Sequence, residues 1–243
     1  MTVIITMAGL GSRFTDRGYR LPKHMIQARG KALFEWSLLS LADFYECKFI
    51  FACLAEHDLN WIKKSAQNVG IGDVSVIPRV SVSRGQAETA YDIMDCIPCD
   101  HPIVIANIDT YIKRGIFASD IGKHDGTVYV VKSSNPGLSY VKYTNDGFVS
   151  DVVEKQVISE WATVGVYGFK SCRLFANLYR KAYHDKNIKE VQGERYIAPM
   201  YRYLLDENGS INTPILAVDD VNFIGTPSEL QLFESKAPSA TKL

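Results

Sequence analysis

Residues 1–14 read MTVIITMAGLGSRF, and this stretch decides the fold. The apolar run at residues 3–7 leads directly into Gly9 and Gly11, with Arg13 close behind. A short apolar run bounded by a turn signal is typical of a buried β-strand. Glycines after such a strand let the backbone approach a phosphate and point amides at it, and an arginine can neutralise its charge. The stretch therefore predicts a buried strand that enters a phosphate-binding turn.

Two known phosphate-binding patterns do not fit this turn. A dinucleotide-binding turn reads G-x-G-x-x-G, but Phe14 stands where the third glycine is needed. A P-loop reads G-x-x-x-x-G-K-[ST], and the stretch lacks that spacing as well. A strand and turn in which the glycines are purely structural therefore stays open as an alternative.

Apolar, β-rich runs alternate with helical patterns through the first half of the chain. Such alternation predicts a parallel sheet covered by helices on both faces, with ligands at the carboxyl ends of the strands. The expected strands are residues 3–7, 48–54, 74–77 and 102–107, and the expected helices are residues 32–44, 58–69 and 86–95.

The second half changes to a mixed pattern. Asn145-Asp-Gly147 is a strong hairpin signal between two short strands, because these residues tolerate positive φ. We predict one α/β domain over residues 1–243, with a Rossmann-like, mixed and mostly parallel sheet flanked by helices, and a small β extension in the second half. The expected strands are residues 127–132, 140–143, 148–153, 162–169 and 211–218, and the expected helices follow Ser171, span 194–205 and start at Pro227.

The composition excludes several classes of protein. Lys and Arg number 27, as do Asp and Glu, and 47% of the residues are hydrophobic. That balance argues against disorder and against nucleic-acid binding through bulk positive charge. No run approaches the roughly 18 apolar residues of a membrane helix, and no basic stretch precedes the first apolar run as in a signal peptide. We therefore expect a cytoplasmic protein with small-molecule ligands and no membrane or nucleic-acid partner.

The glycine turn is the first of a series of motifs, and their order is recognisable. The series resembles the sugar-phosphate nucleotidyltransferase (NDP-sugar pyrophosphorylase) family, which has a GT-A-like nucleotidyltransferase fold. The resemblance covers most of the chain, and its strength lies in the order rather than in any single motif. The motifs are Ala8-Gly-Leu-Gly-Ser-Arg13, Pro22-Lys23, Gly30-Lys-Ala-Leu33, Gly85-Gln-Ala-Glu88, Asn107-Ile-Asp109, Glu154-Lys155, Gly165-Val-Tyr167 and Ile224-Gly-Thr-Pro227.

The resemblance implies a Mg²⁺-dependent transfer of a nucleotidyl group from a nucleoside triphosphate to a phosphorylated acceptor, with release of pyrophosphate. It implies a nucleotide-binding half at residues 1–110 and an acceptor-binding half at 111–243. The implied catalytic residues are Arg13, Lys23 and Asp109, with Asp109 also a metal ligand. The implied nucleotide-binding residues are Ala8, Gly9, Leu10, Gly11, Ser12, Arg13, Gly85, Gln86, Glu88 and Asn107, and the implied acceptor-binding residues are Glu154, Lys155 and Gly165.

The clearest departure from the family pattern is Phe223, which stands where the family carries a second metal-binding aspartate before Ile-Gly-Thr-Pro. A phenylalanine cannot bind magnesium. Asp219 or Asp220 could substitute, although strand alternation would turn at most one of them to the site. Otherwise Asp109 and the nucleotide phosphates hold the metal. His24 also departs from the pattern, and we expect a solvated loop histidine.

Other readings stay open. The acceptor is expected to be a sugar 1-phosphate for surface-glycan or capsule precursors, but a cytidylyltransferase with a small phosphocholine-like or phosphoamide acceptor shares these motifs. A catalytically silent nucleotide-binding homologue is a further alternative, kept alive by Phe223. A Rossmann dehydrogenase is disfavoured by Phe14 and by the Pro-Lys, Glu-Lys and Gly-Thr-Pro segments. A homo-oligomer is compatible with the sequence.

Overall fold

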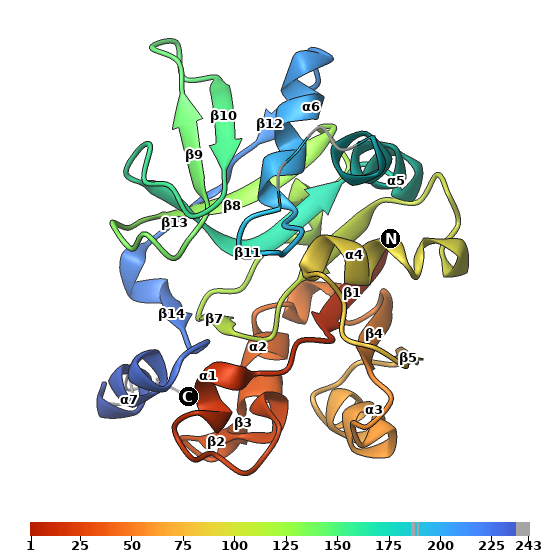
Figure 1. Cartoon of the computed structure of the whole chain (residues 1–243), viewed down its shortest axis with the longest axis vertical. Helices are drawn as coiled ribbons and strands as arrows, with labels where there is room; N and C mark the ends of the chain where they lie inside the picture. Colours follow the sequence, from red (N-terminus) through yellow and green to blue (C-terminus); the bar gives the residue numbers. More distant parts are fainter. Residues whose placement is uncertain (186–187, 189, 237–243) are drawn as a thin grey trace.

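Strand β1 (Thr2–Met7) lies inside the main sheet, parallel to β4 (Lys48–Leu54) on one side and to β6 (Ile103–Ala106) on the other (Figure 1). The computed structural model describes residues 1–185, 188 and 190–236. Within these residues the main sheet has ten strands, in the order β10-β9-β11-β6-β1-β4-β5, with β8 beside β11 and with β12 and β13 beside β8. The predicted mixed α/β sheet is confirmed.

The remaining elements have the following bounds. In the first half they are α1 (Ser12–Thr15), β2 (Gln27–Ala28), β3 (Lys31–Ala32), α2 (Leu33–Leu39), α3 (Leu59–Asn68), β5 (Asp73–Arg79), α4 (Gln86–Tyr91) and β7 (Thr110–Ile112). In the second half they are β8 (Gly126–Lys132), β9 (Tyr140–Tyr143), β10 (Val149–Val153), β11 (Trp161–Phe169), α5 (Cys172–Tyr179), α6 (Tyr201–Asp206), β12 (Ile211–Asn212), β13 (Ile215–Leu216), β14 (Val221–Phe223) and α7 (Pro227–Ser235).

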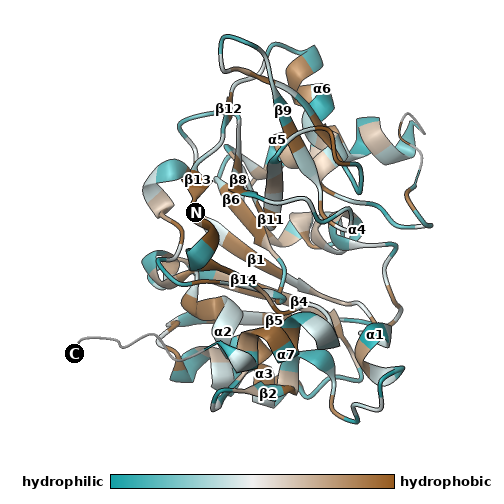
Figure 2. Cartoon of the chain, turned by 90° about the vertical axis from the view of Figure 1, so that its left-hand side faces the viewer, coloured by the Kyte–Doolittle hydropathy of each residue, from teal (hydrophilic) through white to brown (hydrophobic). Residues whose placement is uncertain are grey.

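Side chains of β1 alternate between two hydrophobic cores, which explains the consecutive apolar residues Val3–Ile5. Val3 and Ile5 pack with α2 and α3 on one face, whereas Ile4 packs with α4 and α5 on the other. Successive side chains of a strand point to opposite faces, so a strand covered on both sides must be apolar throughout. Figure 2 shows the result: the central strands are brown for much of their length, and hydrophilic residues gather on the outer turns.

The second half attaches to this parallel sheet through β11, which runs antiparallel to β6, β8 and β9. The pairing of β11 with β8 shifts register between Thr163 and Tyr167, around Gly165. Irregularities of this kind bend a strand and redirect side chains, and they are common beside functional sites. The predicted hairpin between β9 and β10 and the helix α5, with Ser171 accepting from the Leu174 amide, are confirmed.

Four predicted elements are wrong in extent. The helices expected over residues 32–44 and 86–95 end at Leu39 and Tyr91, and a separate 3₁₀ turn follows each. The helix expected over residues 194–205 begins only at a short 3₁₀ turn (Ala198–Met200) and continues as α6. The strand expected over residues 211–218 is split into β12 and β13, because Pro214 cannot donate to the ladder, and is followed by a 3₁₀ turn (Val218–Asp220). Among the described residues, no helix is long and apolar enough to cross a bilayer.

Candidate active site

A cleft of about 630 Å³ lies where the carboxyl ends of β1 and β6 meet the loops of the second half. It is lined from one side by the glycine turn after β1 and from the other by the loop after β10. Most of the residues singled out from the sequence line this cleft. They are Ala8, Gly9, Leu10, Ser12, Arg13, Gly85, Gln86, Asn107, Asp109, Glu154, Lys155 and Gly165.

Lys23 reaches this cleft through Asp109. Its Nζ atom donates to Asp109 Oδ2 across 2.7 Å, so the lysine and aspartate expected near the reacting phosphate are brought together. Gly11 lies directly behind the lysine, with a φ of +65°, and a Cβ at Gly11 would lie 3.2 Å from Lys23 Cβ. Gly11 therefore positions the lysine through its turn and does not itself line the cleft.

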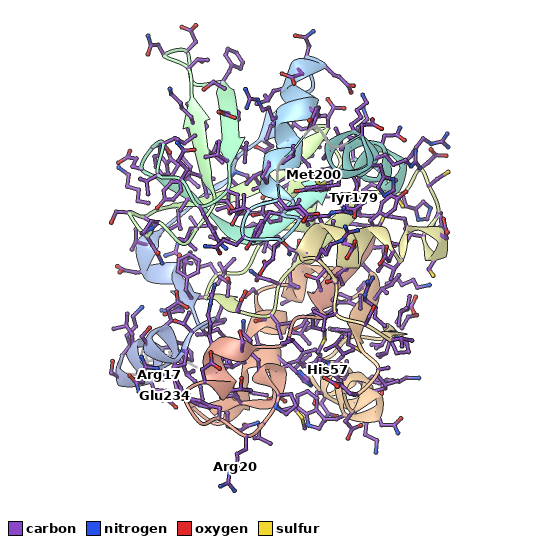
Figure 3. All side chains as sticks on the ribbon, in the orientation of Figure 1. Arg17, Arg20, His57, Tyr179, Met200 and Glu234 are labelled. Atoms are coloured by element: carbon purple, nitrogen blue, oxygen red, sulfur yellow. The ribbon has the colours of Figure 1, made fainter. Side chains whose placement is uncertain are left out.

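His24 is buried, so the expectation of a solvated histidine is wrong. Its ring packs at 4.5 Å from the ring of His57, which lies in the loop after β4 and is labelled in Figure 3. Burial, with a smaller contribution from His57, lowers the pKa of His24 to about 4, so the ring is neutral at pH 7. The apolar packing of this neutral ring anchors the turn that carries Lys23.

The Ile224–Gly225 segment lies against Asp109. The Ile224 amide donates to the Asp109 carbonyl at 2.8 Å, and a Cβ at Gly225 would lie 3.0 Å from Asp109 Oδ2. Strand β14 pairs with β7 so that Phe223 lies opposite Thr110, and both residues line the cleft. The motif near the C-terminus is thus beside the carboxylate, as the resemblance implied, but with an aromatic ring in the aspartate position.

Neither candidate for the second metal carboxylate lines the cleft. Asp219 is exposed in the 3₁₀ turn before β14, and Asp220 pairs with Arg114 at 3.2 Å. Because this segment is a turn, the strand alternation invoked for it does not apply. Among the residues that the structure describes, no cluster of three or more His, Cys, Asp or Glu side chains could hold a metal ion. One carboxylate oxygen is suited to a cation: Asp109 Oδ1 is buried without a hydrogen-bond partner.

Asn107, in the loop after β6, and Gly165, in β11, are in contact where both line the cleft. The Asn107 amide donates to the Gly165 carbonyl at 3.3 Å. Gly165 has a φ of +77°, and any Cβ there would overlap Asn107 Nδ2. Gly165 is therefore required by the close approach of β11 to the loop after β6.

Glu154 directly follows β10 and contacts a network of hydroxyl groups. Ser139 donates its hydroxyl to Glu154 Oε2, and the Thr163 and Tyr167 hydroxyls lie 3.0 Å apart beside Ser139. Burial raises the pKa of Glu154 to about 7, against the lowering effects of the Ser139 hydrogen bond and the Lys155 charge. At neutral pH this carboxyl can therefore both accept and donate hydrogen bonds.

Lys155 follows with a φ of +52°, which costs a non-glycine residue about 1 kcal/mol. Its Nζ atom donates to Tyr196 OH at 2.5 Å and to Gln192 Oε1 at 2.8 Å. The strained backbone thus places the Lys155 ammonium group beside Tyr196, and both residues line the cleft.

Glu88 does not line the cleft. Arg84 donates from its backbone amide and its side chain to the Glu88 carboxylate, at 2.6 to 2.9 Å. Arg195 lies 3.4 Å from the same carboxylate. Burial raises the pKa of Glu88, but the bonds from Arg84 and the charge of Arg195 outweigh it, and the net shift is downward. The role of Glu88 beside the base stays a prediction, and its contacts here are structural.

The sequence did not point to several polar residues that line the cleft. Tyr196 and Glu194 lay within a segment that the pattern assigned to a helix. Ser139 carries no local signal, because its place in the cleft comes from the pairing of β9 and β11. Tyr167 belongs to the Gly165-Val-Tyr167 motif, but no role in the site was expected for its side chain. Further such residues are Asn135, Thr89 and Glu229.

Known structures share this architecture. No family model and no curated protein matches the sequence. A nucleoside-diphosphate-sugar pyrophosphorylase from Vibrio cholerae RC9 is 29% identical, with a TM-score of 0.84 over 97% of this chain and 100% of that one. A proposed glucose-1-phosphate thymidylyltransferase from Bacillus anthracis, solved with sucrose, is 16% identical, with a TM-score of 0.77 over 96% and 94% of the two chains.

A third similar structure is the inositol-1-phosphate CTP transferase of T. maritima, at 14% identity and a TM-score of 0.73 over 96% of this chain and 93% of that one. At such low identity the second and third structures show the fold alone. The first extends the likeness to the sequence over nearly the whole chain. The chain therefore has the fold of the sugar-phosphate nucleotidyltransferases, and both the resemblance and the enzyme class predicted from its motifs are confirmed.

Proposed function

We propose that this protein transfers a nucleotidyl group from a nucleoside triphosphate to a sugar 1-phosphate, in a Mg²⁺-dependent reaction that releases pyrophosphate. One observation carries the proposal: a single cleft is lined by the glycine turn with Arg13, by Asp109 and by the Glu154–Lys155 loop, and Lys23 pairs with Asp109 from outside that lining. Each group suits one part of the reaction. The cytoplasmic location and a role in surface-glycan or capsule precursor synthesis belong to the same proposal.

In this reaction an oxygen of the acceptor phosphate forms a bond to the α-phosphorus, and the bond from that phosphorus to the bridging oxygen of pyrophosphate breaks. Negative charge spreads over the phosphate oxygens, so catalysis consists mainly of positioning and charge neutralisation. The backbone of Gly9 and its neighbours holds the triphosphate, and Arg13 neutralises the leaving pyrophosphate. Lys23 stabilises the charge at the α-phosphate, and Lys155 holds the phosphate of the acceptor.

Asp109 is the residue that would hold Mg²⁺. Its Oδ2 atom is paired with Lys23, but Oδ1 is buried and has no partner, which fits a hard cation that prefers oxygen ligands. Mg²⁺ is commonly held by one or two carboxylates together with substrate phosphates, so a single carboxylate is sufficient. When bound, the ion would neutralise charge on the phosphate oxygens.

The acceptor wall favours a hydroxyl-rich molecule. Hydroxyl groups of Ser139, Thr163 and Tyr167 surround the carboxyl of Glu154, and this network can exchange hydrogen bonds with the hydroxyls of a sugar. A sugar hydroxyl can add a hydrogen bond to this network, which an acceptor without hydroxyls cannot do, so such an acceptor should bind more weakly. This observation favours a sugar 1-phosphate over a small phosphocholine-like acceptor.

The test combines nucleotide binding with product formation. Thermal stabilisation by CTP, UTP, GTP, ATP and dTTP, each with and without Mg²⁺, should identify one preferred nucleotide. A ligand that binds only the native state, at a concentration of about 100 Kd, raises the free energy of unfolding by roughly 2.7 kcal/mol. Pyrophosphate release is then measured with that nucleotide and a panel of sugar 1-phosphates, phosphocholine and phosphoethanolamine. Release with a sugar 1-phosphate supports the proposal, and release only with a non-sugar acceptor supports the cytidylyltransferase alternative. Binding without release in any combination supports the silent homologue.

A further inference from the structure

We propose that Arg195 is a positioning residue that couples the two substrate sites. It fixes the loop of residues 84–88 on the nucleotide side and, through the bridging segment (residues 190–196), places Tyr196 beside Lys155 on the acceptor side. The two walls of the cleft are then held in place by one segment. The kinetic part of this inference rests on the proposed function, whereas its structural part does not.

Arg195 is a buried cation with a full set of partners. Its side chain is 9% exposed, and its guanidinium donates to Glu190 Oε1 and to the Tyr179 hydroxyl, each at 2.8 Å. It also lies beside the ring of Tyr183, at 5.4 Å from the centroid. Tyr179 is labelled in Figure 3, on α5 where this helix packs on α4. A buried charge is tolerated only when such partners compensate for the loss of water, so these contacts fix the guanidinium.

Arg84 completes a balanced cluster of two arginines and two glutamates. Glu88 lies between Arg84, at 2.7 Å, and Arg195, at 3.4 Å. Glu190 lies between the same two arginines, at 3.7 Å and 2.8 Å. The charges cancel, and removal of one member takes from each of its two partners one of the two opposite charges that it contacts. The cluster therefore joins the 84–88 loop to the bridging segment as one unit.

The backbone of Arg195 holds the same loop a second time. Its amide donates to the Arg84 carbonyl, and its carbonyl accepts from the Ala87 amide at 3.1 Å. Gly85 makes this approach possible: it has a φ of +110°, and a Cβ there would lie 2.7 Å from the Arg195 carbonyl oxygen. The glycine of the Gly85-Gln-Ala-Glu88 motif is thus required by contact with Arg195, whatever the loop binds.

The next residue along the chain reaches the acceptor loop. Tyr196 OH accepts from Lys155 Nζ at 2.5 Å, and Gln192 of the same segment accepts at 2.8 Å. The Tyr196 carbonyl is itself held by the Tyr183 hydroxyl at 2.6 Å. Since Arg195 and Tyr196 are consecutive, a shift of one moves the other. The position of the 84–88 loop therefore affects the position of Lys155, through Arg195 and Tyr196.

Amide hydrogen exchange of the protein without ligands tests the structural part. Two amides report on the two walls: Ala87 donates to Arg195, and Lys155 donates to the Leu138 carbonyl at 3.1 Å. In Arg195→Met both amides should exchange faster, while the matched variant Arg173→Met, which removes an exposed arginine of α5, should change neither. Faster exchange at Ala87 alone would overturn the coupling. If Arg195→Met proves unfolded in a thermal melt, Glu88→Gln keeps the shape of the cluster, removes one charge, and should raise both exchange rates.

Steady-state kinetics test whether the coupling serves the reaction. Arg195→Met should raise the KM of both substrates by about 5-fold or more, the lower end of typical couplings between sites, with a smaller fall in kcat. Tyr196→Phe should raise the KM of the acceptor only. The double variant should have an acceptor KM no higher than that of the worse single variant, because both changes interrupt one connection. Multiplying effects would overturn the proposal. A wild-type protein without turnover would refute the proposed function, and the exchange experiment would still decide the structural part.

Discussion

The Nζ atom of Lys23 lies 2.7 Å from Oδ2 of Asp109, although 85 residues separate them along the chain. The pair joins the turn after the first strand to the loop after β6, at the point where adjacent parallel strands end. The lysine occupies one carboxylate oxygen and leaves the other free. The Asp109 carboxylate therefore holds the Lys23 ammonium group on Oδ2 and offers Oδ1 as a ligand for a cation.

Loss of the lysine charge should greatly reduce turnover. Lys23→Met should lower kcat by about 10²- to 10³-fold, the usual effect of removing one preorganised group that stabilises transition-state charge. The fold should survive, because the pair is partly exposed. Pyrophosphate release measures the rate, circular dichroism the fold, and Lys63→Met on α3 provides a control at an exposed lysine. A rate within a few-fold of the wild type would remove Lys23 from the mechanism.

Asp109 alone should carry the metal requirement. Asp109→Asn should raise the Mg²⁺ concentration needed for half-maximal activity, whereas Asp219→Asn and Asp220→Asn should leave it unchanged, because neither side chain lines the cleft. Activity titrated with Mg²⁺ at saturating nucleotide measures the effect. An increased requirement in either of the latter two variants would show that it supplies a carboxylate after all.

Glu154 should make stability depend on pH. Its pKa in the folded protein is about 7, above the ordinary glutamate value of 4.5, so the folded state binds the proton more tightly than the unfolded state does. This contribution is complete below about pH 4.5 and is lost as pH rises through 7. The shift corresponds to at most about 3 kcal/mol. The melting temperature of Glu154→Gln minus that of the wild type should therefore increase between pH 5 and pH 8. A difference that does not change with pH would contradict the raised pKa.

Two of the glycines that line the cleft, Gly9 and Gly165, should respond differently to alanine. A Cβ at Gly9 meets nothing within 4 Å, so Gly9→Ala should change stability by no more than about 0.5 kcal/mol. It should nevertheless weaken nucleotide binding, because the methyl group would stand where a phosphate approaches. Gly165→Ala should instead destabilise the fold by about 1–3 kcal/mol through Asn107 and its positive φ. Urea unfolding and nucleotide titration separate the two effects, and unchanged affinity in Gly9→Ala would speak against a phosphate-binding turn.

Local sequence was sufficient where one element carries the signal. The apolar run of β1 predicted a buried strand, and the alternation of strands and helices in the first half predicted the parallel sheet and the edge at which Asp109 lies. The same reasoning failed for Tyr196, because the spacing of apolar residues from 194 to 205 is helical. That segment is held out of the helix by tertiary contacts of the Arg195 backbone with the 84–88 loop.

The sequence also failed to predict which way some side chains point. Glu88 lies in a motif expected to contact the nucleotide, yet its carboxylate turns to Arg84 and Arg195. His24 follows the lysine in a polar loop, yet it packs into the protein against His57. In both cases the partner comes from a distant part of the chain, so the residue's own neighbours in sequence could not reveal it.

The most direct test of the proposed function follows the α-phosphorus. The purified protein is incubated with Mg²⁺, a sugar 1-phosphate and the preferred nucleoside triphosphate labelled at the α-position. We expect the label in a nucleoside diphosphate sugar, one unlabelled pyrophosphate per product, and much less of both from Asp109→Asn at the same Mg²⁺ concentration. Label that stays in the triphosphate with every nucleotide and acceptor, from a folded protein that binds the nucleotide, would contradict nucleotidyl transfer.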